Sequence, residues 1–137
     1  MNLNKNIFRA YDIRGIAYEE LSQEVVVLIG KSLGTKSLES GNDSLVVGRD
    51  GRNSSPDLFK WIAAGIKSTG CNVINIGVVS TPILYFATHS LSCPNGVMIT
   101  GSHKPGDYNG FKVVKDKKVF QEKLYKISEI KFLRKSF

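Results

Sequence analysis

Glycine and proline residues divide this sequence into short apolar runs that alternate with amphipathic segments, and this alternation constrains the fold more than any other feature. The runs are between four and seven residues long, a length that suits buried strands. Strands are therefore predicted at residues 45–48, 73–79, 97–100 and 111–114, with a further short strand over residues 7–13.

Helix signals fall between these predicted strands. Ser22 precedes apolar residues spaced at the 3.6-residue period and is predicted to cap a first helix. Ser55, followed by Pro56, predicts the cap and the first residue of a second helix. Thr81 opens a third helix that runs to about residue 90, and a Lys-rich helix is expected from residue 120 onward.

Alternation of strand and helix is typical of α/β proteins, in which right-handed crossovers place helices on both faces of the sheet. We predict a three-layer α/β/α fold whose four-stranded sheet is mainly parallel, or mixed, in a single domain over residues 1–137. Ligands of such sheets lie beyond the carboxyl ends of the strands. The segments expected there are the loop after Ile13, residues 49–52 and residues 101–103.

Composition argues against a membrane protein and a secreted one. No apolar run reaches the roughly 18 residues of a membrane span, and the first seven residues contain no apolar signal segment. Cys71 and Cys93 have neither the spacing of a zinc site nor the number needed for a disulfide framework. The pattern indicates reduced thiols in a cytoplasmic protein.

The net charge of +7 is concentrated at one end of the chain. From Lys112 onward nine Lys or Arg accompany three Asp or Glu, whereas the rest of the chain carries ten positive and nine negative residues. No aromatic-interleaved or helix-turn-helix pattern accompanies the basic segment, so we expect a solvated Lys-rich helix face and no nucleic-acid partner.

The loop over residues 100–110 carries the chemistry that is easiest to interpret. Ser102, His103 and Lys104 bring a hydroxyl, an imidazole and an ammonium group together between glycines, which let backbone N–H groups turn toward an anion. Ser102 is a candidate nucleophile or phosphate carrier. Adjacent residues need not face each other, so no serine-hydrolase triad is implied, and an ordinary turn between two strands is the alternative.

Two further polar segments follow predicted strands. Arg14 offers a planar fork of donors suited to phosphate, and the alternative is a surface ion pair with Asp12. Residues 48–52 place Arg49 and Arg52 in a glycine-containing turn near a helix start. The alternative there is a structural turn held by pairing between Asp50 and an arginine.

Three segments together resemble the α-D-phosphohexomutase superfamily, in particular the N-terminal domain of its phosphomannomutase and phosphoglucomutase branch. They are residues 8–15 (FRAYDIRG), residues 48–52 (GRDGR), and residues 96–112, which contain the Ser-His pair. Their order and separation also match, and the likeness runs from about residue 6 to about residue 131. Residues 132–137 are then expected to be a truncated tail.

The resemblance implies roles for individual residues. Ser102 would carry the phosphoryl group as phosphoserine and, through it, contact a magnesium ion. His103, Arg14 and Lys112 would surround that group and handle protons and charge. Tyr11 would border the sugar site.

The resemblance also implies an activity. The family interconverts hexose 1-phosphate and hexose 6-phosphate through a bisphosphosugar, as an isomerase of carbohydrate metabolism. Its magnesium loop, sugar-selecting loop and phosphate clamp belong to three further domains that this sequence does not contain. We therefore expect an incomplete phosphotransferase that is inactive alone, binds magnesium weakly and self-associates where the missing domains would dock.

Two alternatives remain open at this stage. The chain could form an active mutase with a separately encoded remainder, or serve as a non-catalytic phosphate- or protein-binding module that retains the fold. Lys104 departs from the family, which usually has Asn at this position, and the resemblance assigns it no role. The preference between glucose and mannose is also open.

Overall fold

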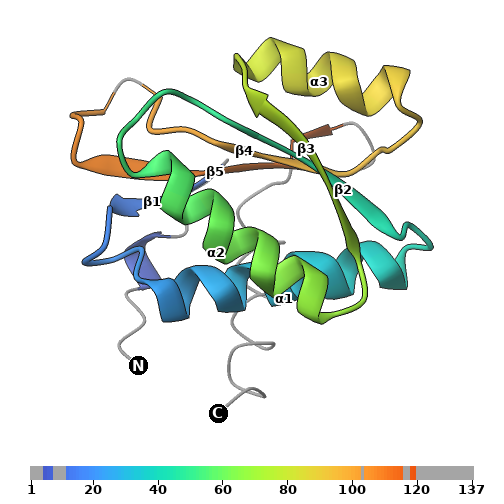
Figure 1. Cartoon of the computed structure of the whole chain (residues 1–137), viewed down its shortest axis with the longest axis horizontal. Helices are drawn as coiled ribbons and strands as arrows, with labels where there is room; N and C mark the ends of the chain where they lie inside the picture. The colour runs from blue at the N-terminus through green and yellow to red at the C-terminus, as the bar shows by residue number, and fades with distance from the viewer. Residues whose placement is uncertain (1–4, 8–11, 103, 116–117, 120–137) are drawn as a thin grey trace.

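A computed structural model describes residues 5–7, 12–102, 104–115 and 118–119, which form a mixed six-stranded sheet with helices on both faces (Figure 1). The strands follow the order β1-β5-β4-β2-β3, and β6 pairs with β5. Their bounds are Ile13–Ile16 (β1), Ser44–Arg49 (β2), Asn72–Val78 (β3), Gly96–Ile99 (β4), Tyr108–Lys115 (β5) and Lys118–Val119 (β6).

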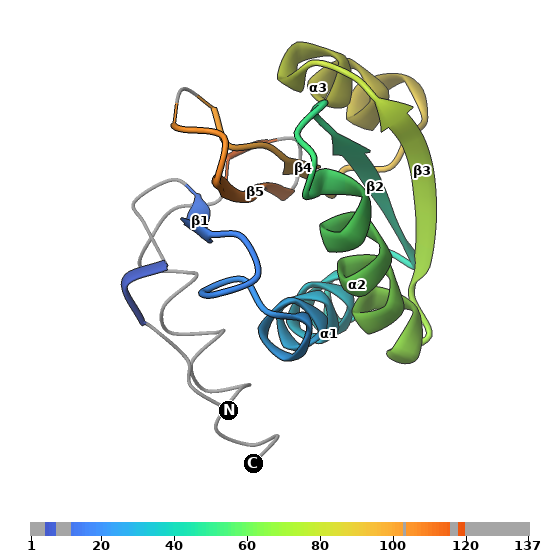
Figure 2. The ribbon, with the colours of Figure 1, turned by 60° about the vertical axis from the view of Figure 1, so that its left-hand side comes forward.

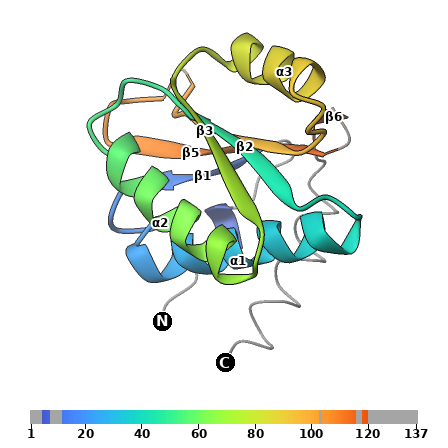
Figure 3. The ribbon, with the colours of Figure 1, turned by 45° about the vertical axis from the view of Figure 1, so that its right-hand side comes forward.

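Helices α1 (Gln23–Glu39) and α2 (Ser55–Ser68) cover one face of the sheet, and α3 (Thr81–Ser90) covers the other (Figures 2 and 3). Each face has its own apolar core. The larger lies beneath α1 and α2, and the smaller joins α3 to Val46, Met98 and Val114. The three-layer α/β/α prediction is confirmed.

The sheet is mixed because its connections differ. Helices α2 and α3 are crossovers, so β2 runs parallel to β3 and to β4. A short loop joins β4 to β5, and these two strands are antiparallel, as are the pairs β1–β5 and β5–β6. The sheet therefore has six strands where four were predicted, and the edge formed by β1, β5 and β6 is antiparallel.

The N-terminal elements differ in part from their prediction. A 3₁₀ turn spans Lys5–Ile7 and β1 begins at Ile13, so Ile7 is not in the strand predicted over residues 7–13. Residues 8–11 of that prediction lie outside the described residues. The helix expected from residue 120 lies outside the described residues. Within the ranges that the structure describes, no helix is both long and apolar enough to cross a membrane.

Helix starts test the predicted caps. The Ser22 hydroxyl accepts a 3.3 Å hydrogen bond from the Val25 N–H, as predicted. Ser55 is not a cap, because α2 begins at Ser55 itself and Ser54 occupies the cap position. The Ser55 hydroxyl instead donates a 2.7 Å hydrogen bond to Asp50. The Ser55 hydroxyl therefore binds the Asp50 carboxylate in the preceding loop and does not cap the helix.

Two glycines let α1 and α2 pack backbone against backbone. A Cβ atom on Gly65 would lie 2.1 Å from the Val27 carbonyl oxygen, and one on Gly30 would lie 2.4 Å from the Ile62 carbonyl oxygen. Neither obstacle is a flexible side chain, so the helices would have to separate to admit a methyl group.

We predict that Gly65→Ala lowers the free energy of unfolding by about 1–3 kcal/mol, because overpacking outweighs the gain in helix propensity. Gly51→Ala is the matched control, since its Cβ would meet nothing within 4 Å. Urea titration of both variants measures the effect. A Gly65→Ala chain as stable as the control would contradict the close helix contact.

Candidate functional site

Ser102 lies in the loop between β4 and β5 with a backbone φ of 54°. Residues other than glycine seldom adopt this left-handed conformation, which costs of the order of 1–3 kcal/mol unless surrounding contacts hold it. Two contacts do so here. The Ser102 N–H donates to the Thr100 hydroxyl oxygen at 3.0 Å, and the Ser102 carbonyl accepts from Arg52 at 3.0 Å.

Arg52 binds the backbone of this loop at several points. Its Nη2 also donates to the Lys104 carbonyl at 2.7 Å, and its Nη1 donates to the carbonyls of Pro105 at 2.6 Å and Tyr108 at 3.1 Å. Gly101 packs directly on the guanidinium, since a Cβ atom there would lie 2.2 Å from Arg52 Cζ. One side chain thereby contacts most of the turn that carries Ser102.

Asp50 binds both Arg52 and the loop that contains Ser102. It accepts hydrogen bonds from the Ser55 hydroxyl at 2.7 Å and from the N–H groups of Arg52 at 3.2 Å and Gly101 at 3.1 Å, and it pairs with Arg52 Nε at 3.3 Å. Burial alone would raise the pKa of the Asp50 carboxyl, but these hydrogen bonds bring it below its ordinary value. The carboxylate is therefore the stable form.

Asn109 extends this polar cluster into the start of β5. Its side chain is fully buried and donates to the hydroxyls of Ser54 at 2.8 Å and Ser55 at 3.0 Å, while its oxygen accepts from the Gly110 N–H at 2.9 Å. The first turn of α2, the end of β2 and both ends of the loop are thus joined by buried and partly buried hydrogen bonds, which favour one loop geometry.

The strand register brings Arg14 and Lys112 together. Arg14 pairs with Gly110, and Lys112, two residues further along β5, pairs with Met98. Both positions therefore lie on the sheet face that α3 covers, as diagonal neighbours whose backbone positions are typically about 7–8 Å apart. The Thr100 N–H donates to the Gly110 carbonyl at 2.9 Å, so the Ser102 loop leaves β4 beside this pair.

Arg14 keeps one donor unused. Its Nη2 lies 2.5 Å from Asp12 Oδ2, and both side chains are largely covered, at 20% and 11% exposed, so this is not a surface ion pair. Among the residues described, Arg14 Nε and Ser32 Oγ are the buried side-chain polar atoms without a hydrogen-bond partner. A buried guanidinium with an open donor is suited to receive an anionic oxygen.

The structure places three of the five predicted site residues, Ser102, Arg14 and Lys112, around the junction of β4, β5 and β1. His103 and Tyr11 lie outside the described residues. Pairing between Asp50 and an arginine was one of the two interpretations of residues 48–52, and it is present as the Asp50–Arg52 ion pair. The contacts of Arg52 with the serine loop were not predicted. No local signal could have shown them, because they join residues 50 to 56 positions apart.

The described residues do not form a magnesium site by themselves. Mg²⁺ prefers octahedral oxygen ligands that include carboxylates. Ser102 could offer one phosphoryl oxygen, but over the described ranges no three His, Cys, Asp or Glu side chains gather to hold a metal ion. Asp50, whose carboxylate contacts the Ser102 loop through the Gly101 N–H, is already bound to Arg52 and Ser55.

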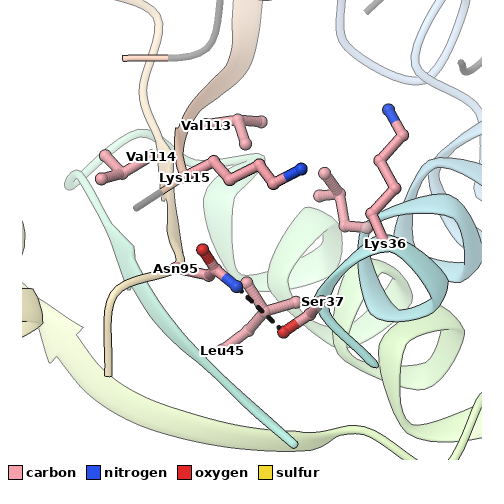
Figure 4. A pocket seen from close by; sticks show the side chains of 8 residues that line it. Lys36, Ser37, Leu45, Asn95, Val113, Val114 and Lys115 are labelled. Carbon is pink, nitrogen blue, oxygen red and sulfur yellow. Dashed lines mark hydrogen bonds between the residues drawn. The ribbon is translucent and has the colours of Figure 1, made fainter. Parts of the chain in front are cut away.

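A small pocket lies at the other end of β4, away from Ser102. The Asn95 side-chain amide donates a 3.2 Å hydrogen bond to the Ser37 hydroxyl, and Lys36 and Lys115 are among the residues that line the pocket (Figure 4). Its volume is about 20 Å³, which is room for one water molecule and not for a sugar. The Ser37 hydroxyl also donates to the Asn42 carbonyl at 2.8 Å, so the polar groups there tie α1 to the strand starts.

Comparison with known proteins agrees with this architecture. The family model described as phosphoglucomutase/phosphomannomutase, alpha/beta/alpha domain I, matches residues 5–134, and the chain belongs to this family. The solved structure of a phosphoglucomutase/phosphomannomutase family protein from Burkholderia thailandensis superposes with a TM-score of 0.89 at 34% identity, covering 99% of this chain and 31% of that one. The resemblance read from the sequence is confirmed.

Curated relatives are considerably longer. The phosphomannomutase/phosphoglucomutase of Pseudomonas aeruginosa is 49% identical over 112 residues, which are 82% of this chain and 24% of that protein. The phosphoglucomutase of Neisseria meningitidis serogroup B is 49% identical over 113 residues, 82% of this chain and 25% of that protein. The chain thus spans about a quarter of the length of these relatives.

We predict that Asp50→Asn lowers the free energy of unfolding by ~1.5–3 kcal/mol at pH 7, since it weakens hydrogen bonds to a charged acceptor. A carboxyl whose pKa falls on folding stabilises the folded state above its unfolded pKa and loses that effect as the pH falls through its folded pKa. The difference from the unmodified chain should therefore shrink below about pH 4.

Urea titrations between pH 7 and pH 3 measure this difference. Asp107→Asn, at an exposed position of the same loop, is the matched control and should change stability by less than ~0.5 kcal/mol at pH 7. A loss at Asp50 that is equal at pH 3 and pH 7 would show that its charge does not stabilise the loop.

Proposed function

We propose that this chain is the phosphoserine-bearing first domain of a phosphohexomutase, which interconverts hexose 1-phosphate and hexose 6-phosphate through a bisphosphosugar. The observation that carries the proposal is the position of Ser102, in a loop held at several points beside the Arg14 and Lys112 pair. Phosphoryl transfer requires positioning and charge neutralisation above all, and this arrangement supplies both.

The proposed reaction has two transfers. A hydroxyl oxygen of the hexose phosphate attacks the phosphorus on Ser102, the bond from phosphorus to Ser102 Oγ breaks, and a bisphosphosugar forms. After this intermediate reorients, Ser102 Oγ attacks the other phosphoryl group and releases the isomeric monophosphate. His103 would accept the proton of the attacking hydroxyl and return it to the leaving oxygen, and Tyr11 would border the sugar.

The cations act on the charge that moves in each step. The phosphoryl oxygens carry negative charge throughout the transfer, and fixed donors in a partly buried site stabilise it without reorganising. Arg14 is suited to this role because its Nε is buried without a partner, and Lys112 adds a second positive group on the same face.

The remainder of the activity is assigned to protein outside this chain. We propose that the carboxylate ligands of magnesium, the sugar selector and a second phosphate clamp come from the other domains of the family, and that the chain alone does not turn over hexose phosphates. The length of the relatives supports this division, because the matched region is about a quarter of each.

We predict that Ser102→Ala abolishes mutase activity when residues 1–134 replace the equivalent domain of the Pseudomonas aeruginosa relative. The hydroxyl is the proposed phosphoryl acceptor, so its loss removes the covalent step. Activity on glucose 1-phosphate and mannose 1-phosphate, together with peptide mapping of bound phosphate, measures the outcome. Ser90→Ala is the matched control, because Ser90 is an exposed residue at the end of α3.

An active Ser102→Ala fusion, or phosphate mapped to another residue, would refute the assignment. An unmodified fusion that binds hexose phosphates but takes no phosphate on Ser102 would favour the non-catalytic binding module instead. A purified 137-residue chain that converts hexose phosphates with magnesium and bisphosphate activator would refute the proposed dependence on further domains.

We predict that Arg14→Ala and Lys112→Ala each lower kcat/KM of that fusion by about 10²–10³-fold, the usual cost of removing one donor to a developing negative charge. Lys104→Asn is the matched control, because Lys104 is exposed and the change installs the residue usual in the family. Steady-state kinetics measure the effect. A large loss at Lys104 with none at Arg14 would mean that the loop faces away from the β1 edge.

A further inference from the structure

We infer that Arg52 is a positioning residue for the phosphoryl carrier, and that it sets the backbone conformation of the Ser102 loop without binding substrate. The inference rests on the proposed function for the identity of the carrier. Its evidence is independent of that function, because it concerns the contacts of one guanidinium with the loop.

Every donor of Arg52 has an acceptor inside the protein. A guanidinium carries five N–H groups. Nη1 donates to the carbonyls of Pro105 and Tyr108, and Nη2 donates to those of Ser102 and Lys104. Nε forms an ion pair with the Asp50 carboxylate. No donor is left for a phosphate, so Arg52 is not a substrate ligand.

This occupancy separates Arg52 from Arg14. The two arginines have similar exposure, at 16% for Arg52 and 20% for Arg14, yet Arg14 Nε is buried without a partner. The unpaired Nε of Arg14 suits a residue that binds an anion. The fully paired guanidinium of Arg52 suits a residue that fixes the conformation of a protein loop.

A planar cation is required because four carbonyl oxygens converge on one place. Carbonyl oxygens carry partial negative charge and would repel one another without a positive group between them. An ammonium group has only three donors and no fixed plane, so lysine cannot satisfy five acceptors in this geometry. Glutamine would supply two donors and no charge.

Gly101 leaves room for the Arg52 guanidinium because it has no side chain. A Cβ atom on Gly101 would lie 2.2 Å from Arg52 Cζ and 2.3 Å from Arg52 Nε, so any side chain at position 101 displaces the guanidinium. The Gly101 N–H also donates to Asp50, the carboxylate that orients Arg52. The strained Ser102 residue follows immediately, with its carbonyl on Arg52.

The test uses the 137-residue chain and backbone NMR. Arg52→Gln and Arg52→Lys should both change the carbonyl ¹³C shifts of residues 102–108 and should accelerate hydrogen exchange at the Lys104 N–H, which donates to the Gly101 carbonyl, by at least about tenfold. Arg49→Gln is the matched control, because Arg49 lies over the Phe59 ring and contacts Asn75 instead of the loop.

Gly101→Ala provides a second perturbation that leaves the arginine in the sequence. It should reproduce the shift changes of Arg52→Gln, and the double variant should resemble either single variant, because both remove the same contact. If one Arg52 variant does not fold, Gly101→Ala still tests whether loss of the Arg52 contact changes the loop. In the fusion enzyme, Arg52→Lys should lower kcat at least about tenfold with KM little changed, since a displaced carrier slows transfer without removing a substrate ligand.

Loop shifts and Lys104 exchange that remain unchanged in Arg52→Lys and Gly101→Ala would overturn the inference. A rise in KM with kcat unchanged would also overturn it, because it would make Arg52 a substrate ligand. The NMR result does not depend on phosphorylation. A loosened loop in a protein whose Ser102 never carries phosphate would leave the positioning role intact and refute the proposed function alone.

Discussion

The contact between Asp50 and Arg52 is the interaction on which the site depends. Both residues follow β2, an interior strand that pairs with β3 on one side and β4 on the other. Because β2 and β4 are parallel, the residues after β2 meet the loop after β4 at one edge of the sheet. Asp50 accepts from that loop and from α2, and Arg52 donates to four loop carbonyls, so a single ion pair joins three elements.

The pair is stable in a largely covered position because its polar atoms are paired. A charge taken out of water is costly unless hydrogen bonds replace its hydration. Each donor of Arg52 has a protein acceptor, and Asp50 receives a hydroxyl and two backbone N–H groups in addition to the guanidinium. The hydrogen bonds that lower the pKa of Asp50 therefore also keep the loop in the conformation in which Ser102 has a positive φ.

Local sequence signals predicted the elements whose formation is local. The Ser22 cap, the helix from Thr81 and the buried runs of β2 and β4 follow from periodicity and capping, and the structure has them. The antiparallel edge could not be predicted, since pairing between β1 and β5 joins segments about 100 residues apart. For the site, Ser102 and Arg14 were first singled out by residue type and position after a predicted strand, whereas Lys112 came from the motif resemblance. Arg52 was missed in its main role, because nothing in its neighbours reveals which carbonyls it will meet.

Two arginines near one loop illustrate why residue type alone does not assign a role. Arg14 and Arg52 each pair with an aspartate two residues earlier in the chain, and each is largely covered. Their remaining donors distinguish them: those of Arg52 are used up by the loop backbone, whereas Arg14 Nε has no acceptor in the part of the chain described. An unsatisfied buried donor costs ~1–3 kcal/mol, which an arriving anionic oxygen can relieve. The saturated arginine offers no such gain and instead binds the backbone of the loop that contains Ser102.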